Sequence, residues 1–428
     1  MTKTMERSTI IFIASLLVIA TVTSFSCGVL VWRFRVWPYE HLSVLITHAK
    51  NYETYGVWAP RNLVVAPPGN ASRERIVMHD KEAMMPGYRA ILGWDYQRNR
   101  HAVWLLDEQG KEVHQWVFRY STLVKDQDDT GKFHAAGDEK THALVVLDDG
   151  SIVINLEDRL LSRIDVCSKP VWVKPGAYHH SLEWSGDGML WTWRGETSYA
   201  DHYQFMQKLD PWTGDTVEEF SLIDDFVKQS PDRMKIFRLT QDFSFQHAGD
   251  AGMLDIFHVN DVEALGADKA EMYPEFSAGD LLVSLRNIDL VAVLDPARRK
   301  IKWWMHGPWF HQHDPDFGAD GRISVFNNNV LQRQSNIVYV DPKNNNVSIP
   351  ALTEQAVFYT EEMGKHERLP NGNILITVPG EGRILEVTSD GELAFEFNNV
   401  INNRANGYVA NARWLPADFF KTAPSCSG

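Results

Sequence analysis

The sequence predicts an all-β fold, a six-bladed β-propeller, preceded by one N-terminal transmembrane helix. Three observations predict this. A unit of two alternating apolar strands around a polar turn occurs six times along the chain. Five of these units follow a histidine, a glycine-centred turn and a short apolar strand. A single uncharged apolar run near the N-terminus is long enough to cross a bilayer of roughly 30 Å.

The apolar run covers residues 10–32, "IIFIASLLVIATVTSFSCGVLVW". A cleaved signal peptide would have a shorter apolar stretch that ends at small residues. Here apolar residues continue past "SFSCG", so an uncleaved signal anchor is favoured over cleavage. Lys3 and Arg7 precede the run and Arg33 and Arg35 follow it, so loop charge does not fix the orientation. We expect the large C-terminal part to be translocated.

The remaining organisation follows from composition. Residues 1–9 form a short N-terminal tail, and residues 33–85, which include "APPGNAS", are expected to form an irregular juxtamembrane stem. Residues 86–418 hold the strand patterns and are predicted to form the propeller, with residues 419–428 as a C-terminal tail.

The six hairpin units predict the blades. They begin near residues 101, 161, 203, 290, 336 and 383. Alternating apolar residues on both sides of turns rich in Asp, Gly, Asn, Pro or Lys are typical of hairpins. A spacing of roughly 45 residues, as between the last three units, is typical of propeller blades. The units lack the i, i+3, i+4 pattern of helical repeats, and a β-sandwich would not need the same unit six times.

The histidine repeat predicts a shared pocket. Its members are His142, His180, His258, His313 and His366. Equivalent positions of successive blades are related by rotation about the central channel, so histidines far apart in sequence can meet there. The alternative is that each histidine only satisfies backbone groups of a turn or strand.

Charge and cysteine content exclude some classes of function. The formal net charge of −14 argues against general nucleic-acid binding, because phosphate attraction needs a basic surface. Cys27 lies in the apolar run, so Cys167 and Cys426 could form at most one disulfide. The three cysteines offer no CxxC metal or redox motif.

Several motifs in order resemble one family. "HHS", "HVND", "LLVSLRN", "GPWFHQHDPDF", "GRISVFNNN" and "HERLPNGNILITVPGEGRILEVTSDGE" are similar to the bacterial arylsulfate sulfotransferases. The resemblance implies a six-bladed propeller that transfers a sulfuryl group from an aryl sulfate donor to a phenolic acceptor. It implies no nucleotide sulfate donor. We assign no metal ligand and no cofactor from the sequence, and whether the reaction requires a metal stays open. With the apolar run, it implies a single-pass protein of the bacterial inner membrane with a periplasmic catalytic domain.

The resemblance also implies roles for individual residues. His313 in "QHDPD" aligns with the histidine nucleophile, which is transiently sulfated. His180, His258 and Arg286 align with residues that bind and neutralise the sulfuryl oxygens. Asp314, His366 and His142 remain possible supporting residues, because the alignment gives His366 and His142 no catalytic role and Asp314 could equally cap a turn.

These residue types suit sulfuryl transfer. As in phosphoryl transfer, charge spreads over equatorial oxygens while nucleophile and leaving group lie in line, so catalysis depends on positioning and electrostatic stabilisation. Arg286 supplies a rigid fork of donors for an oxyanion. A protonated His180 or His258 would supply a proton to the leaving phenolate. A neutral His313 is a competent nucleophile and predicts ping-pong kinetics.

Two departures and two rival functions stay open. The family's better-described enzymes are exported and soluble with an extra N-terminal β domain, and they often have an Asp-Asn pair where this chain has "FNNN". The first rival is an enzyme with a histidine-bound metal on the axis, disfavoured by the nearby Arg286 cation. The second is a non-catalytic, membrane-tethered propeller that binds a complex partner. A homo-oligomer is equally compatible with the sequence.

Overall fold

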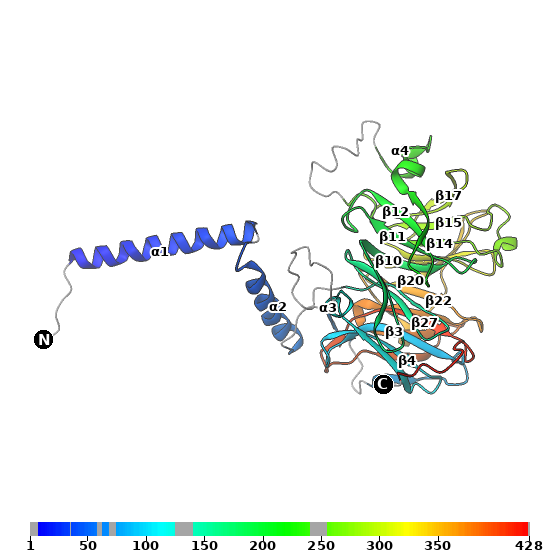
Figure 1. Cartoon of the computed structure of the whole chain (residues 1–428), viewed down its shortest axis with the longest axis horizontal. Coiled ribbons are helices and arrows are strands. Elements are labelled where there is room, and N and C mark those ends of the chain that lie inside the picture. Colours follow the sequence, from blue (N-terminus) through cyan, green and yellow to red (C-terminus); the bar gives the residue numbers. More distant parts are fainter. Residues whose placement is uncertain are drawn as a thin grey trace. The chain divides into compact units, whose positions relative to one another are not determined.

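The structure is a computed structural model that describes residues 7–34, 36–57, 62–67, 74–124, 140–239 and 255–426. Most of the expected tail of residues 1–9 lies outside these ranges. The described chain forms two units, a helical one that ends before Asn62 and a strand-rich one from Asn62 onward (Figure 1).

The helical unit contains α1 (Arg7–Phe34) and α2 (Tyr39–Tyr55). Within the described residues, α1 is the one helix that is long and apolar enough to cross a membrane, as the sequence predicts. Helix α2 corrects the expectation that residues 33–85 are irregular. Its apolar residues Leu42, Leu45 and Ile46 follow helical spacing. It ends at Gly56, whose left-handed backbone (φ 70°) allows its N–H to bond the Tyr52 carbonyl at 2.9 Å.

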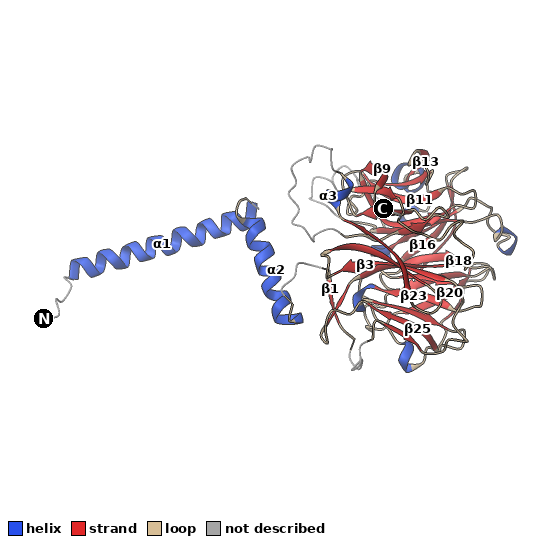
Figure 2. Ribbon diagram, turned by 60° about the horizontal axis from the view of Figure 1, so that its bottom comes forward, coloured by secondary structure: helices blue, strands red, loops and turns tan. Residues whose placement is uncertain are grey.

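The strand-rich unit is a six-bladed β-propeller (Figure 2). Blade 1 consists of β27 (Val409–Leu415), β3 (Tyr88–Asp95), β4 (Arg100–Leu106) and β5 (Glu112–Phe118). Blade 2 consists of β6 (Leu144–Val146), β7 (Ile152–Leu156), β8 (Leu160–Ile164) and β9 (Pro170–Pro175). Blade 3 consists of β10 (Ala177–Trp184), β11 (Leu190–Gly195), β12 (Gln204–Leu209) and β13 (Thr216–Ser221).

The other three blades have the same antiparallel order. Blade 4 consists of β14 (Val259–Ala264), β15 (Leu281–Leu285), β16 (Leu290–Asp295) and β17 (Lys300–His306). Blade 5 consists of β18 (His313–Phe317), β19 (Ile323–Asn327), β20 (Asn336–Asp341) and β21 (Asn346–Ser348). Blade 6 consists of β22 (Lys365–Arg368), β23 (Ile374–Val378), β24 (Arg383–Val387) and β25 (Leu393–Asn398).

The ring closes through strands from both ends of the propeller. Strand β27, near the C-terminus, is the innermost strand of blade 1 and pairs with β3. Strand β2 (Ile76–Met78) adds a fifth strand to blade 6 by pairing with β25, and β1 (Leu63–Val65) pairs with β26 (Ala405–Gly407). Both β1 and β2 lie in the expected stem, so part of that segment contributes to these sheets.

Both sequence repeats are confirmed. Each of the six predicted hairpins forms the third and fourth strands of one blade, counted from the axis, and each predicted histidine repeat leads into the two inner strands of one of blades 2 to 6. Short helices connect the strands within the described residues: α3 (Tyr120–Leu123), the π-helix η1 (Leu222–Val227), α4 (Arg233–Ile236), and the 3₁₀ turns η2 (Ala270–Met272), η3 (Arg286–Ile288), η4 (Glu354–Ala356) and η5 (Pro379–Glu381).

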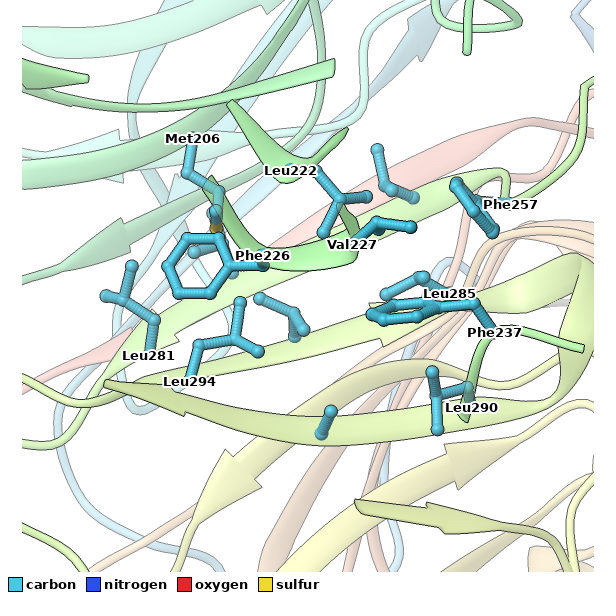
Figure 3. Packing of buried hydrophobic residues seen from close by; sticks show 14 of the residues in the cluster. Met206, Leu222, Phe226, Val227, Phe237, Phe257, Leu281, Leu285, Leu290 and Leu294 are labelled. Atoms are coloured by element: carbon cyan, nitrogen blue, oxygen red, sulfur yellow. The ribbon is translucent and has the colours of Figure 1, made fainter. Parts of the chain in front are cut away.

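Apolar side chains fill the spaces between blades. The cluster between blades 3 and 4 includes η1, whose Leu222 and Phe226 pack with Leu281 and Leu294 of blade 4 (Figure 3). This packing explains the long interval between the third and fourth hairpins, because the extra segment extends the core of the ring. Burial at these interfaces holds the inner strands, and hence the axial side chains, in fixed positions.

A disulfide joins Cys167, in the turn between β8 and β9, to Cys426 beyond β27, which settles the pairing the sequence left open. It closes a loop with a sequence separation of 259 residues.

We expect Cys426→Ser to lower the free energy of unfolding by about 2–4 kcal/mol, because the cross-link restricts the unfolded chain. Denaturant titration of the intact protein measures this loss. Adding a reductant should lower the midpoint of the wild type but leave that of Cys426→Ser unchanged; equal midpoints for all samples would contradict the expectation.

Candidate active site

The innermost strands of the six blades surround one axis. Consecutive members of the set touch around the whole ring: β6 contacts β10, β10 contacts β14, β14 contacts β18, β18 contacts β22, β22 contacts β27, and β27 contacts β6. Every predicted site residue except Arg286 lies on one of these strands or within two residues of its start. Arg286 directly follows β15, the strand next to β14 in blade 4. The fold therefore brings together side chains that are more than two hundred residues apart.

β-Bulges aim successive side chains of these strands at the axis. Register shifts mark them between His179 and Leu182, Val259 and Asp261, His313 and Asp316, and Val409 and Asn411. His180, His258 and Asp314 have positive φ angles of 56°, 46° and 48°, which side-chain-bearing residues rarely adopt. Backbone strain of this kind concentrates at functional sites.

Four of the five repeated histidines form one cluster. The ring centroid of His180 lies 4.7 Å from that of His142, 5.2 Å from that of His258 and 6.5 Å from that of His313. Tyr199 packs edge-on against His258, with ring centroids 5.4 Å apart. The prediction that histidines from different blades meet is correct for this set.

A pocket of about 260 Å³ of empty space, part of it open to solvent, lies beside the cluster. Its lining combines imidazoles, an amide, a buried lysine and small or apolar residues: His142, His180, Asn260, His313, Met363, Gly364, Lys365 and Ala410. The predicted nucleophile and His180 therefore both face this pocket.

The hydrogen bonds of His313 fix its tautomer. Its Nδ1 lies 2.7 Å from Oδ1 of Asn328, and the Asn328 amide nitrogen donates to the carbonyls of Thr360 and Met363 at 3.0 and 2.7 Å. Asn328 therefore presents its oxygen to His313, so Nδ1 carries the proton. Burial, with the charge of Arg286, lowers the pKa of His313 to about 3. The ring is neutral at pH 7 and Nε2 keeps its lone pair.

A similar chain of hydrogen bonds fixes His180. The Gln204 amide nitrogen donates to three backbone carbonyls, so its Oε1 accepts from Nε2 of His179 at 2.8 Å. Burial lowers the pKa of His179 to about 4, so this neutral ring accepts at Nδ1. Nδ1 of His180, 2.8 Å away, is then the donor. Because burial also lowers the pKa of His180 well below its usual value, its Nε2 is unprotonated.

His258 forms a different kind of pair. Its Nδ1 donates to the Asp255 carboxylate, and its backbone N–H donates to the other oxygen of Asp255 at 2.9 Å. A carboxylate at Nδ1 orients the ring, as general acid–base catalysis requires. His258 and His180 therefore differ in their partners, because Nδ1 of His258 donates to a carboxylate whereas Nδ1 of His180 donates to a neutral imidazole.

Arg286 begins the turn after β15, beside His258. Its backbone N–H donates to the His258 carbonyl at 3.1 Å, and its side chain donates to Oδ1 of Asn287 at 3.0 Å. Burial lowers the pKa of Arg286, opposed by nearby acidic groups, and its charge in turn lowers the pKa of His313. Arg286 thus supplies a half-buried positive charge near the predicted nucleophile.

The two other supporting candidates lie away from the histidine cluster. Asp314 accepts from the ammonium of Lys365 and, at Oδ2, from the backbone N–H of His366 at 2.6 Å. The His366 ring contacts Asp314 at 3.2 Å and Oγ of Ser324 at 2.8 Å, and its side chain is almost fully buried. Asp314 therefore orients the His366 ring, and both residues belong to the packing beneath the pocket.

The ammonium of Lys365 sits at the centre of this packing. It lies 3.0 Å from carboxylate oxygens of both Glu183 and Asp261, in addition to Asp314. Glu183 also pairs with Arg413 at 2.7 Å. These residues come from β10, β14, β18, β22 and β27, so this buried ion network ties five innermost strands together.

The sequence signature of the family described as arylsulfotransferase (ASST) matches residues 143–400, more than half of the chain. The chain belongs to the arylsulfotransferase family. The match runs from the start of blade 2 to the end of blade 6, and all the predicted site residues except His142, one position before its start, lie inside it. The resemblance found in the motifs is confirmed at the level of the family.

Other comparisons add no function to this arylsulfotransferase-family chain. No curated protein matches its sequence. A protein of unknown function from Bacteroides caccae has a TM-score of 0.48 and 10% identity, covering 77% of this chain and 98% of its own. Virginiamycin B lyase from Staphylococcus aureus has a TM-score of 0.36 and 14% identity, covering 61% and 71%. BamB from Moraxella catarrhalis has a TM-score of 0.33 and 12% identity, covering 79% and 96%.

Sequence reasoning missed five residues of the site in this arylsulfotransferase-family member: His179, Asp255, Asn260, Asn328 and Lys365. Three of them had a visible signal, because they stand inside the motifs "HHS", "HVND" and "FNNN". Asn328 is the middle asparagine of "FNNN", the place where the sequence departs from the family's usual Asp-Asn pair. Asp255 and Lys365 had no signal of this kind, because their partners come from positions that only the fold reveals.

Proposed function

We propose that this protein is a membrane-anchored arylsulfotransferase that carries the sulfuryl group on Nε2 of His313. The observation that supports this most is the tautomer of His313. Asn328 holds the proton on Nδ1, so the lone pair of Nε2 is available in the pocket beside His180, near the positive charge of Arg286. A neutral, oriented imidazole next to a cation is what attack on an anionic sulfate ester requires.

In the first half-reaction, Nε2 of His313 forms a bond to sulfur while the sulfur–oxygen bond to the aryl group breaks. The phenolate leaves with the electron pair of that bond, and the Asp255–His258 pair supplies a proton where the leaving phenolate needs one. The sulfated ring gains positive charge, which the hydrogen bond from Nδ1 to Asn328 stabilises. Arg286 neutralises the sulfuryl oxygens as charge develops on them.

In the second half-reaction, an acceptor phenol loses its proton to His258 and its oxygen attacks sulfur. The nitrogen–sulfur bond breaks, the electron pair returns to Nε2, and His313 is again neutral. His180 has no proton on Nε2 at neutral pH, so in this scheme it accepts a hydrogen bond from the hydroxyl of the acceptor phenol and donates none to the sulfuryl oxygens. This differs from the donor role that the sequence suggests for it.

The proposed location is the bacterial inner membrane, with the propeller in the periplasm. Helix α1 supports a single membrane anchor. The disulfide between Cys167 and Cys426 supports an oxidising compartment for the propeller, because such bonds are rare in the reducing cytosol.

Asn328→Asp is expected to shift the acidic limb of the pH–rate profile upward. The neutral fraction of His313 falls as pH falls through its pKa, which is about 3 in the wild type, so the wild type keeps a neutral nucleophile throughout the mildly acidic range. A carboxylate at position 328 stabilises the charged ring and raises that pKa. The pH dependence of kcat/KM for the free enzyme measures the shift. An acidic limb at the same pH in both proteins would count against this role of Asn328.

The proposed function is tested with the full-length chain in detergent, 4-nitrophenyl sulfate and a phenol. We expect release of 4-nitrophenolate to depend on the phenol and to yield the sulfated phenol, with no adenylyl sulfate nucleotide present. Absence of turnover in a folded protein, across several phenols and at both neutral and mildly acidic pH, would contradict the proposal and favour a binding propeller.

A further inference from the structure

Three described groups of acidic and histidine side chains have ligand atoms close enough to surround a metal ion. In two of these groups, other side chains already balance the carboxylate charges or bond the histidine ring nitrogens. Lys365 occupies the first, formed by Glu183, Asp261 and Asp314. In the second, both ring nitrogens of His366 are hydrogen-bonded, to Asp314 and Ser324. The third group, His142, Glu157 and His180, has neither feature.

His142 is the first sign that the third group lacks a ligand. The residue is 5% exposed, and neither of its ring nitrogens has a hydrogen-bond partner within the described part of the chain. Its Nε2 lies 3.5 Å from Oε1 of Glu157. Buried polar nitrogens in native proteins are almost always bonded, so a histidine with two bare nitrogens that lines a pocket indicates a missing partner.

His180 is the second sign, and it is independent of the first. The hydrogen bonds from Gln204 through His179 place the proton of His180 on Nδ1. Its Nε2 therefore presents a lone pair, the form in which a histidine binds a metal. The hydrogen bond from Nδ1 to a neighbouring ring also fixes the orientation of His180, as outer partners of metal-binding histidines do.

The spacing and chemistry of the group suit a borderline divalent metal. One ligand atom from each residue lies within 4.8 Å of the other two. Tetrahedral zinc with ligands at about 2.0–2.2 Å separates its ligand atoms by roughly 3.3–3.6 Å. Nε2 of His142 and Oε1 of Glu157 already lie 3.5 Å apart, and side-chain rotation must bring the third ligand atom to a similar distance. Two imidazoles and a carboxylate form a set that zinc uses in catalytic sites, with a fourth position left open.

Charged groups of both signs act on Glu157. Asp158 and Glu362 act on Glu157 electrostatically, and Lys140 is the opposing cation among the described groups that do so. Lys140 is itself near Glu362, with Nζ and a carboxylate oxygen 3.8 Å apart. Among these charged groups Lys140 acts most strongly on Glu157, and Asp158 and Glu362 oppose it.

We propose that His142, Glu157 and His180 form a zinc site at the edge of the pocket, and that zinc there inhibits sulfuryl transfer. Coordination would occupy the Nε2 lone pair of His180, which could then no longer accept a hydrogen bond from an acceptor phenol in the pocket. The metal-binding half of this inference does not depend on the proposed function, whereas the inhibition does.

Isothermal titration of the full-length protein in detergent with ZnCl₂, without any sulfate ester, tests binding directly. We expect one zinc ion per chain for the wild type. Glu157→Gln and His142→Gln should weaken binding by about 100-fold or more, since loss of even an outer partner costs 10- to 100-fold. His114→Gln, on the outermost strand of blade 1, is the matched control and should bind as the wild type does. With cobalt in place of zinc, the wild type should show the intense visible bands of a four-coordinate site, and Glu157→Gln and His142→Gln should not.

Circular dichroism establishes whether each variant is folded. If His142→Gln does not fold, Glu157→Gln still tests the site, because it changes a partly exposed side chain with little change in volume. Equal zinc affinity in Glu157→Gln and the wild type, or no binding by the wild type, would overturn the site. Zinc binding that leaves wild-type turnover of 4-nitrophenyl sulfate unchanged would overturn the inhibition, and absence of turnover without zinc would instead contradict the proposed function.

Discussion

His313→Gln is expected to lower kcat for sulfuryl transfer by at least about 1,000-fold, because removing a covalent nucleophile removes the whole two-step route. Glutamine keeps a polar side chain of similar reach, so the hydrogen bond of Asn328 can be retained. The neighbouring His180 cannot replace the nucleophile, since its orientation is fixed separately through His179. Release of 4-nitrophenolate under saturating donor and phenol measures the loss.

The control for this prediction is His114→Gln, which removes an imidazole from the outer strand β5. It should keep wild-type turnover, and both variants should show the circular dichroism of the wild type. A folded His313→Gln protein with turnover within about tenfold of the wild type would assign the nucleophile to another residue.

Lys365→Met is expected to lower the free energy of unfolding by about 3–5 kcal/mol, since removing one member of a buried ion network leaves its partners uncompensated. The Lys365 side chain is 9% exposed, and its partners Asp261 and Asp314 are 0% and 2% exposed. Methionine has a similar volume, so the loss reports charge rather than a cavity. Denaturant titration at neutral pH gives the change.

The pH dependence of this loss has a definite sign. Although burial opposes them, the three carboxylates hold the pKa of Lys365 above its usual value, and burial in turn raises the pKa of Asp261. Without Lys365 the buried carboxylates of the folded state bind protons more readily than those of the unfolded chain. Stability of the variant should therefore rise relative to the wild type as pH falls from about 7 toward 5.

Lys421→Met serves as the matched control for the network. Lys421 pairs with Asp148 at 2.8 Å, but its side chain is 75% exposed. An exposed pair contributes little to stability, so this variant should unfold near the wild-type midpoint. Equal effects of Lys365→Met and Lys421→Met would show that the axial network does not hold the inner strands together.

The fold could be predicted because it is a repeat. Alternation around six similar turns specifies the outer strands, and five histidines that each precede a glycine-centred turn, at an equal interval for His142, His180 and His313, specify the inner ones. The same rotation places His142, His180, His258 and His313 together without any knowledge of the loops. Helix α2 was missed because its short apolar stripe, from Leu42 to Ile46, stands among polar residues in a segment with turn-forming sequences.

The chemistry within the site depends on features that no spacing encodes. The tautomer of His313 follows from the orientation of one amide, that of Asn328, which is set by carbonyls of Thr360 and Met363 in a loop before another blade. The difference between His180 and His258 likewise follows from their partners, a neighbouring imidazole and a carboxylate. The bulges that turn these residues toward the axis leave the alternating pattern almost unchanged, so the sequence does not reveal them.

The proposed sulfohistidine is tested most directly by a single-turnover experiment. Full-length protein in detergent is mixed with excess 4-nitrophenyl sulfate without a phenol, quenched in base and digested for mass spectrometry. The mechanism predicts a burst of about one 4-nitrophenolate per active chain and a peptide that carries one added SO₃ group on His313, which is lost when a phenol is added before quenching. Turnover that requires the phenol from the outset, with no burst and no modified His313, would contradict covalent transfer through this residue.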